Sequence, residues 1–428
     1  MAYTPVDLVE VLAWGRAVGA IAPGRQRDSY VFEYDPAWIA DGAEIAPALM
    51  PVARRLYSFP GYSAATWQGL PPPIADSLPD RFGNSIVDAW LARNGVAAEQ
   101  ITALDRLAYL GERGMGALEF RPDHTPALPP PTAIDLAQLI VSARRAVEGS
   151  LGSEDESQAA LRRIIEVGTS AGGARAKAIV NFDPTSAEIR SGHVAPQPGF
   201  QPWLLKFDGM GTDAQLGPGR NYGRVEYAYS LMARAAGIRM SETRLLEEHG
   251  RAHFMTRRFD RTESGERMHM LTLCGMDGLD FNAVGVNDYA QYFARIVALG
   301  LPRENLDQAF LRMTFNVVAA NCDDHTKNAA FLMAPDGTWS LAPAYDVTHA
   351  FAPGNRWLSQ HLMGVNGVFA DIRRSDVMAV ADRFAVEGAL TALAAVRDAV
   401  ASWPQFAAQA GLDPAHADAL AKDFSLLR

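Results

Sequence analysis

The polar segment at residues 321–328, Asn-Cys-Asp-Asp-His-Thr-Lys-Asn, constrains the fold of this chain more than any other stretch. An apolar run with helical spacing, 310–320, precedes it, and the apolar residues 329–333 that follow are typical of a short strand. A Pro-Asp-Gly turn comes next, and then a second strand at 339–344, just before Asp346. The sequence therefore predicts a helix, a polar loop, a hairpin and a carboxylate in that order.

Protein kinases carry their catalytic groups in this order. A loop Asp accepts the proton of the attacking hydroxyl, an Asn further along the loop binds a metal ion, and a later Asp also binds metal. Asp323, Asn328 and Asp346 match these groups in type, and the five-residue step from Asp323 to Asn328 matches in spacing. A solvated turn is the plain alternative, and the segment on its own does not decide between the two.

Composition narrows the class of protein. The chain has 428 residues, of which 48% are hydrophobic and 21% charged, so two or three globular domains are expected. Its net charge of −10 argues against a protein that binds nucleic acid over its whole surface. No apolar run approaches the roughly 18 residues of a membrane span, the N-terminus lacks the pattern of a signal peptide, and two cysteines imply no disulfide framework. We expect a cytoplasmic protein without a membrane partner.

The proline-rich segment 121–132 is the clearest linker. Before it, strands are predicted at 8–14, 18–21 and 30–34, and an amphipathic helix at 80–94. We expect three parts: a domain at 1–121, a lobe at 122–260 and a second lobe at 261–428.

A glycine-rich segment lies in the middle part of the chain and is followed by a predicted strand at 178–180. Its residues of interest are Thr169, Ser170, Ala171, Gly172, Gly173 and Lys177. Small residues let the backbone approach a ligand, and their N–H groups can bind phosphate oxygens. The segment is not a Walker A loop, because it precedes a strand, as the glycine-rich loop of protein kinases does. An ordinary β-turn is the alternative.

Lys206 stands in an apolar strand predicted at 202–207. A buried lysine is costly unless it has an anionic partner. Kinases place their nucleotide-binding lysine on such a strand and pair it with a Glu from the next helix. A helix predicted at 221–236 carries Glu226, which fits that arrangement. A lysine that reaches solvent from an edge strand is the alternative.

The segment 252–261 is predicted to be a strand that runs into a polar stretch, where the link between kinase lobes would fall. The rest of the chain is mainly helical in pattern, near 288–299, 303–320, 370–400 with possible breaks, and 404–426. Strands followed by helices are the two-lobed order of protein kinases. We therefore expect an α+β, protein-kinase-like fold with a small extra N-terminal domain, a β-rich N-terminal part and an all-helical C-terminal lobe.

With these residues placed, the chain resembles the HipA family of bacterial type II toxin–antitoxin serine/threonine kinases. The matching motifs are Ser-Ala-Gly-Gly-Ala-Arg-Ala-Lys (170–177), Leu-Leu-Lys-Phe (204–207), Arg-Arg-Phe-Asp-Arg (257–261), Asp-Asp-His-Thr-Lys-Asn (323–328) and Pro-Ala-Tyr-Asp (343–346). Segments 75–84 and 113–118 look like the family's smaller N-terminal domain. The resemblance covers most of the chain and rests on the ordered set of motifs.

The resemblance implies a role for each residue. Asp323 would be the catalytic base, His325 would support its loop, and Lys206, paired with Glu226, would contact the α- and β-phosphates. Mg²⁺ would be bound by Asn328 and Asp346. ATP would be bound by Thr169, Ser170, Ala171, Gly172, Gly173, Lys177, Lys206, Arg257, Phe259 and Lys327.

Ser170 would be the site of autophosphorylation, with Thr169 beside it as a second candidate. A phosphate adds roughly −1.5 to −2 charge. On the glycine-rich loop it would displace the loop from ATP and silence the kinase.

The resemblance also implies a biological role. The toxin would phosphorylate an aminoacyl-tRNA synthetase, most often glutamate–tRNA ligase, and so halt translation and promote growth arrest and persistence. Its partner would be a small helix-turn-helix antitoxin (HipB-like), through which it would be attached to operator DNA. The alternatives are a kinase of a small molecule or lipid, a non-catalytic co-repressor bound to its antitoxin, and a hydrolytic metal site built from Asp323, Asp324, His325 and His349.

Overall fold

The computed structural model describes most of the chain. The described residues are 5–26, 28–79, 81–124, 177–192, 195–208, 212–213, 217–218, 221–248, 251–262 and 264–427. The predicted glycine-rich segment, 169–173, lies outside them. Two compact units are present, and each is treated by itself. The first comprises Met1–Gly211, Arg257–Gly278 and Leu332–Thr338; the second comprises Thr212–Thr256, Leu279–Phe331 and Trp339–Arg428.

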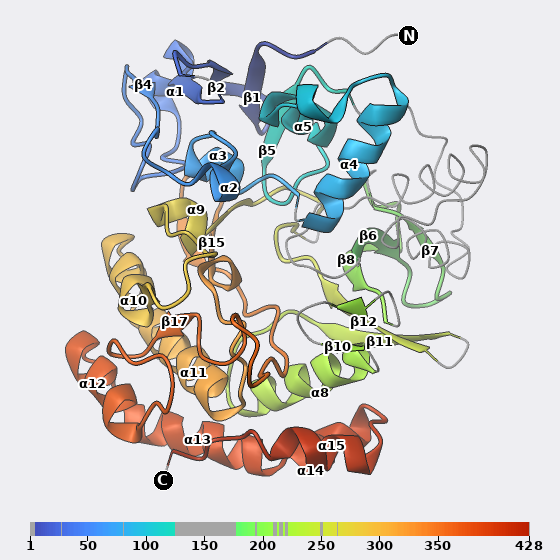
Figure 1. The fold of residues 1–428 in the computed structure, drawn as a ribbon, viewed down its shortest axis with the longest axis vertical. Helices are drawn as coiled ribbons and strands as arrows, with labels where there is room; N and C mark the ends of the chain where they lie inside the picture. Colours follow the sequence, from blue (N-terminus) through green and yellow to red (C-terminus); the bar gives the residue numbers. More distant parts are fainter. Residues whose placement is uncertain are drawn as a thin grey trace. The chain divides into compact units, whose positions relative to one another are not determined.

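An antiparallel sheet of five strands, in the order β4-β3-β2-β1-β5, begins the first unit (Figure 1). The strands are Val9–Ala13 (β1), Arg16–Pro23 (β2), Tyr30–Tyr34 (β3), Leu56–Tyr57 (β4) and Leu118–Arg121 (β5). In β3, Tyr30, Phe32 and Tyr34 are buried and the residues between them are not, which is the period-two pattern of a strand with one covered face. Gly19 of β2 is required there, because a Cβ atom would lie 2.2 Å from the Glu33 carbonyl oxygen.

Short helices accompany this sheet. They are Pro36–Asp41 (α1), Ala64–Trp67 (α2), Pro72–Ala75 (α3), Arg81–Arg93 (α4) and Ala103–Leu110 (α5), with a 3₁₀ turn at Ala98–Gln100 (η1). Thr102 begins α5 as its N-cap and exchanges hydrogen bonds with Asp105, a capping box that satisfies two N–H groups. Gly111, with φ of +54°, ends it.

The remaining elements of the first unit are Lys177–Phe182 (β6), Ile189–Ser191 (β7), Gln201–Lys206 (β8), His269–Thr272 (β13) and Leu273–Asp277 (α9). Strand β6 pairs antiparallel with both β7 and β8. The segment that contains β13 and α9 is bonded to the N-terminal part of the unit. The Thr272 backbone N–H and hydroxyl both donate to the Asp76 carboxylate, at 2.8 and 2.7 Å, and the His269 ring lies 2.9 Å from the Ile45 carbonyl oxygen.

Helices dominate the second unit. They are Tyr222–Ala235 (α8), Tyr289–Ala298 (α10), Glu304–Val318 (α11), Arg374–Phe384 (α12), Ala389–Ala401 (α13), Trp403–Gln409 (α14) and Pro414–Ala421 (α15), with a 3₁₀ turn at Thr326–Asn328 (η2). The strands are Thr212–Asp213 (β9), Gly217–Pro218 (β10), Thr243–Glu248 (β11), Arg251–Arg257 (β12), Asn287–Asp288 (β14), Ala330–Met333 (β15), Trp339–Leu341 (β16) and Met363–Gly364 (β17); β12 and β15 each extend across a boundary between the units.

Helix α11 forms the centre of the second unit's core. Its residues Phe310, Met313 and Phe315 are fully buried, and Tyr292 and Phe293 of α10 are buried as well. Asp288 caps α10 by accepting a hydrogen bond of 2.7 Å from the Ala290 N–H. These two helices carry the loops that hold the candidate site.

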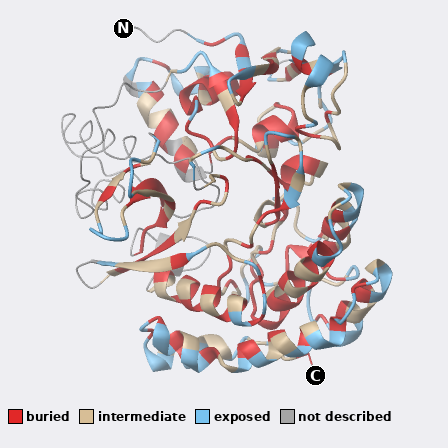
Figure 2. Cartoon of the chain, turned by 180° about the vertical axis from the view of Figure 1, so that it is seen from behind, coloured by how far each residue is buried: buried red, intermediate tan, exposed pale blue. Residues whose placement is uncertain are grey.

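The C-terminal part departs from the expected all-helical lobe in two ways. Short strands, β13, β14 and β17, lie within it. The helix expected at 404–426 is divided, and the stretch at 370–400 has a break, as its pattern allowed. Ala385 and Gly388, with φ of +51° and +66°, separate α12 from α13, and Gly411, with φ of +68°, lies between α14 and α15. Buried and exposed stretches alternate along these C-terminal helices in Figure 2. Within the described residues, the helices are too short or too polar to cross a membrane.

Candidate active site

The loop that follows α11 begins with a sharp turn. Ala320 has φ of +53°, and the side-chain amide of Asn321 donates to the Asn316 side chain at 2.9 Å. The Cys322 N–H donates to the Ala350 carbonyl at 3.0 Å, and the Ala350 N–H donates back to the Ala320 carbonyl at 3.1 Å. The beginning of this loop therefore runs beside residue 350, a short distance along the chain from Asp346.

The two neighbouring carboxylates of the loop differ in exposure. The side chain of Asp323 is 42% exposed, whereas that of Asp324 is 1% exposed. Asp324 accepts hydrogen bonds from the Tyr289 hydroxyl at 2.9 Å and from the Leu362 N–H at 2.8 Å. Of the two, Asp323 is the carboxylate that can meet the hydroxyl of a substrate.

Asn328 braces the loop from its far end. Its side-chain N–H donates to the Asp323 carbonyl at 2.7 Å, and its backbone N–H donates to the His325 carbonyl at 2.8 Å. Because the amide nitrogen is used in this way, the amide oxygen is the atom left to act as a metal ligand. The two residues whose spacing suggested a kinase loop are thus joined directly.

The segment that carries Asp346 is fixed to the same loop. The Tyr345 hydroxyl donates to the Lys327 carbonyl, and the Ala344 N–H donates to the Arg239 carbonyl at 2.8 Å. Asp346 has φ of +54°, a left-handed conformation that Asp tolerates better than most residues and that often marks a functional position.

Asn328 and Asp346, the predicted magnesium ligands, both carry side-chain oxygen atoms. Mg²⁺ is held through hard oxygen ligands, with one or two carboxylates supplemented by waters and phosphate oxygens. No group of three or more His, Cys, Asp or Glu residues that could hold a metal occurs in the described part of the chain. The donor set here is one amide and one carboxylate.

An aromatic ring supports the middle of the loop. The rings of Phe281 and His325 lie 5.5 Å apart, and the Lys327 ammonium lies 4.7 Å from the centre of the Phe281 ring. His325 Nε2 is 3.8 Å from the Asp323 carboxylate. The Thr326 hydroxyl donates to the Leu279 carbonyl at 3.1 Å, which holds the Phe281 segment against the loop.

Two predicted phosphate-binding lysines lie side by side in the first unit. Lys177 of β6 and Lys206 of β8 are cross-strand partners, and both are buried, at 2% and 8% exposure. Like charges placed opposite each other in a sheet repel, so this pair favours an anion nearby. Glu226, its predicted partner, is buried on α8 in the second unit.

Residues of the Arg-Arg-Phe-Asp-Arg segment, 257–261, alternate between half-buried and buried positions. Arg258 and Asp260 are buried, whereas Arg257 and Phe259 are half-buried. Asp260 accepts bonds from the Arg258 guanidinium at 2.7 Å, from Arg261 at 2.8 Å and from the Gly116 N–H at 2.7 Å. Burial favours the neutral acid, but the two guanidinium groups hold the pKa of Asp260 well below its usual range.

The second unit thus brings together Asp323, His325, Lys327, Asn328 and the segment of Asp346. The hydrolytic alternative does not assemble, because the Asp324 carboxylate is buried and His349 pairs with Asp423 at 2.9 Å. Sequence reasoning missed His361 and the buried pair that it forms with Asp324 at 2.9 Å. The Asp-Asp doublet was the visible signal for Asp324, whereas His361 stands in no motif.

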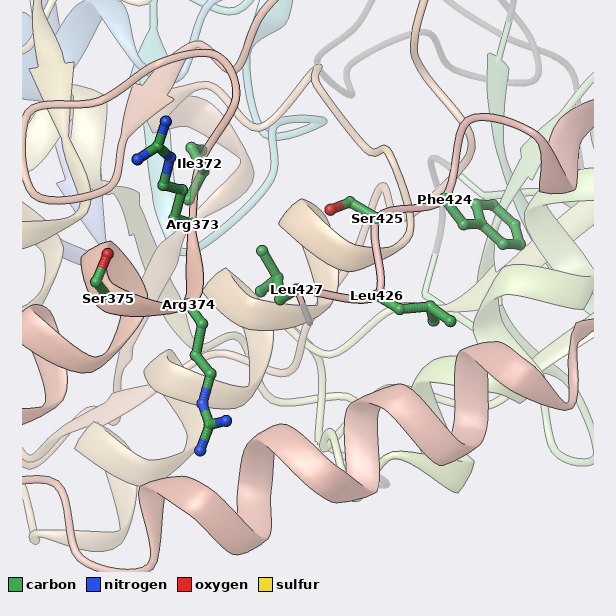
Figure 3. Close-up of a pocket in the computed structure, with 8 residues that line it drawn as sticks. All are labelled: Ile372, Arg373, Arg374, Ser375, Phe424, Ser425, Leu426 and Leu427. Atoms are coloured by element: carbon green, nitrogen blue, oxygen red, sulfur yellow. The ribbon is translucent and has the colours of Figure 1, made fainter.

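A hollow of about 680 Å³ lies elsewhere in the second unit (Figure 3). It is lined by Ile372, Arg373, Arg374, Ser375, Phe424, Ser425, Leu426 and Leu427. In Figure 3, Arg373 and Arg374 point to opposite sides of their segment. None of the predicted site residues lines this hollow.

Comparison with known families and structures gives two kinds of match. The model of the HipA N-terminal domain matches residues 9–121, and that of the HipA-like C-terminal domain matches residues 169–425. Among curated proteins, none matches the chain.

Among solved structures, the chain is similar to HipA of Shewanella oneidensis MR-1, solved with HipB and its operator DNA. The TM-score is 0.66 at 17% identity, covering 98% of this chain and 95% of that one. This likeness shows that the chain has the fold of that HipA, and the mixture of helices and strands confirms the expected α+β class. A Helicobacter pylori proinflammatory kinase, CtkA, also matches, with a TM-score of 0.34 at 13% identity over 52% of this chain and 85% of that one, a likeness too low to support an argument.

Proposed function

The chain belongs to the HipA family, and from this premise we propose that it is an ATP-dependent serine/threonine protein kinase that acts as the toxin of a toxin–antitoxin pair. The observation that carries the proposal is the contrast within the Asp-Asp doublet. Asp323 is exposed and braced by Asn328, beside the segment of Asp346, while Asp324 is buried.

The proposed chemistry assigns one task to each of these residues. Asp323 accepts the proton of the attacking hydroxyl as phosphoryl transfer proceeds. Asn328 and Asp346 would hold Mg²⁺, which would supply positive charge to offset the charge of the phosphates. Lys327, held over Phe281, adds a positive charge beside the same loop, and His325 supports the loop.

Nucleotide binding is proposed for the first unit's lysines and for the predicted loop. Lys206 and Lys177 would bind ATP phosphates, a role that their paired burial supports. Glu226 would pair with Lys206 during catalysis. The other proposed contacts to ATP come from Thr169, Ser170, Ala171, Gly172, Gly173, Arg257 and Phe259. Ser170, or Thr169 beside it, would accept phosphate in an autoinhibitory reaction.

An aminoacyl-tRNA synthetase, glutamate–tRNA ligase first, is the proposed substrate, and halted translation with growth arrest and persistence is the proposed outcome. The support for this is family membership. Transfer to a lipid or small molecule is the competing outcome of the substrate assay.

A second proposed role is co-repression with an antitoxin. The similar Shewanella HipA was solved together with HipB and operator DNA. A HipB-like helix-turn-helix antitoxin would join this chain to operator DNA in the same way. The net charge of this chain, −10, fits an attachment to DNA that is made through a partner.

Mass spectrometry after incubation with Mg·ATP tests the proposal. The wild-type protein is compared with Asp323→Asn, in the presence of glutamate–tRNA ligase, other synthetases or inositol lipid vesicles. We expect the wild-type protein to transfer phosphate to a synthetase and to Ser170, and Asp323→Asn to transfer phosphate to neither. Phosphate on lipid alone would contradict the toxin assignment, and no transfer to any acceptor would contradict the kinase assignment.

A further inference from the structure

We propose that His361 is a positioning residue whose imidazolium, paired with Asp324, holds the loop that presents Asp323. The inference rests on the proposed kinase function. It adds to that function a cation that lies outside every motif recognised in the sequence.

The pair is buried and fully bonded. His361 Nδ1 lies 2.9 Å from one Asp324 oxygen, and the two side chains are 9% and 1% exposed. The same carboxylate oxygen accepts from the Tyr289 hydroxyl at 2.9 Å, and the other oxygen accepts from the Leu362 N–H at 2.8 Å. One carboxylate therefore joins the loop, the start of α10 and the segment before β17.

Each of those anchors is itself fixed. The His361 N–H donates to the Phe369 carbonyl at 2.9 Å, and β17 pairs in parallel with β14, where Met363 stands opposite Asn287. The Tyr289 hydroxyl also accepts from the Asn316 side chain at 2.8 Å. The loop is thus tied to helices α10 and α11, which form the core of the unit.

The charge of His361 follows from its surroundings. The titratable groups that face it are Asp324 and Cys322 from the loop, the latter with its sulfur 3.9 Å from Nε2. Tyr289 of α10 faces it through Asp324. Burial opposes the charged ring, but the Asp324 carboxylate raises the pKa of His361 to about 10. The ring is therefore an imidazolium at neutral pH.

The pair positions the neighbouring base. Asp323 precedes Asp324 directly, and its own carbonyl is held by Asn328. With Asp324 anchored inward, the Asp323 side chain is directed outward, where it is 42% exposed. Loss of the anchor would loosen this geometry. The proton-accepting step would then slow, whereas contacts to ATP made by other elements would remain.

The test is a cycle of three variants: Asp324→Asn, His361→Gln and the double variant. Each single variant should lower kcat about 10- to 100-fold while leaving KM for ATP nearly unchanged, because a small misplacement of the base affects the chemical step. The double variant should be less impaired than either single one, since it leaves no unpaired charge buried.

Amide hydrogen exchange of residues 320–328 is measured on the same proteins, because it reports the loop without requiring activity. Faster exchange is expected in both single variants, with partial recovery in the double. His269→Gln is the matched control: it removes another buried imidazole, bonded to the Ile45 carbonyl, and should leave loop exchange unchanged.

The inference would be overturned if His361→Gln had the kcat and the loop exchange rate of the wild-type protein. It would also be overturned if the losses in kcat of the two single variants simply multiplied in the double variant. If the wild-type protein transferred no phosphate, the proposed function would fail, and the exchange measurement would still decide whether His361 holds the loop.

Discussion

Two short segments of the molecule, 257–261 and 323–328, both contain a buried carboxylate next to half-exposed residues. In the first, Asp260 is buried between Arg258 and Arg261. In the second, Asp324 is buried against His361, a residue far along the chain. Each segment thus has one set of side chains that is buried and fixes the backbone and another set that is half-buried.

The two buried pairs differ in their cation. Burial lowers the pKa of Arg261 to about 9, but Arg258 donates two further hydrogen bonds to the same carboxylate, so the Asp260 cluster does not depend on a single cation. Histidine titrates, so the Asp324 pair also depends on its base. The comparison teaches that the buried carboxylate of the first unit is held by two cations, whereas the one beside Asp323 is held by the imidazole of His361 alone among cationic side chains of the described residues. The following predictions test this contrast.

The largest effect on stability is expected for Asp260→Asn. It leaves two guanidinium groups in a buried site without their carboxylate, which costs about 3–5 kcal/mol of unfolding free energy. The urea midpoint of unfolding measures it. Glu10→Gln on an exposed position of β1 is the control and should change stability by about 0.5 kcal/mol or less. Equal midpoints for the two variants would contradict the cluster's role.

Substitutions of the neighbouring residues Arg257 and Arg258 should differ in their cost to stability. Arg258→Gln should cost about 3 kcal/mol, because Arg258 donates two bonds to the buried Asp260 carboxylate. Arg257→Gln should cost about 1 kcal/mol or less, because Arg257 is half-buried at the end of β12. Urea midpoints decide between them. A larger loss of stability in Arg257→Gln than in Arg258→Gln would contradict the assignment of Arg258 as the buried residue of the two.

The pH dependence of stability should distinguish the two pairs. Since the pKa of His361 is raised to about 10, its pair contributes fully below the unfolded value of about 6.5 and is lost as pH rises toward 10. Since the pKa of Asp260 is lowered, its cluster contributes above about pH 4 and is lost in acid. The difference in Tm between wild type and His361→Gln should therefore shrink from pH 6.5 to 10. A constant difference would argue against a charged ring.

The smallest effect is expected at Phe281. Phe281→Leu removes the ring beneath the Lys327 ammonium, an interaction of about 0.5–1 kcal/mol at such a site. If Lys327 binds phosphate, KM for ATP should rise about two- to fivefold. Phe281→Trp keeps an aromatic face and should stay near wild type. Equal KM values in all three proteins would show that the ring does not orient Lys327.

Local pattern was sufficient to predict much of this fold. Residues that favour strands predicted β1 to β3, helical patterns predicted α4, α8, α10 and α11, and a Pro-Asp-Gly turn separated β15 from β16. Strands β14 and β17 were missed, because two-residue strands whose paired residues are 76 positions apart leave no local signal. The domain boundaries near 121 and 260 stay predictions.

The candidate site was predictable where its residues share one loop. Asp323 and Asn328 are five residues apart, so their relation could be read from spacing. Spacing could not show which Asp of the doublet is the more exposed. That depends on Tyr289, His361 and Leu362, which contact Asp324 only in the folded chain. The burial of Asp324 by distant residues is what supports the proposal that Asp323 is the base.

The measurement that tests the central claim most directly is single-turnover transfer of labelled γ-phosphate by Asp323→Asn, with its urea midpoint recorded alongside. We expect transfer to fall about 10²- to 10⁴-fold, the contribution of a positioned base, while stability stays within about 0.5 kcal/mol of wild type. Transfer at the wild-type rate by a folded Asp323→Asn protein would contradict the assignment of Asp323 as the base.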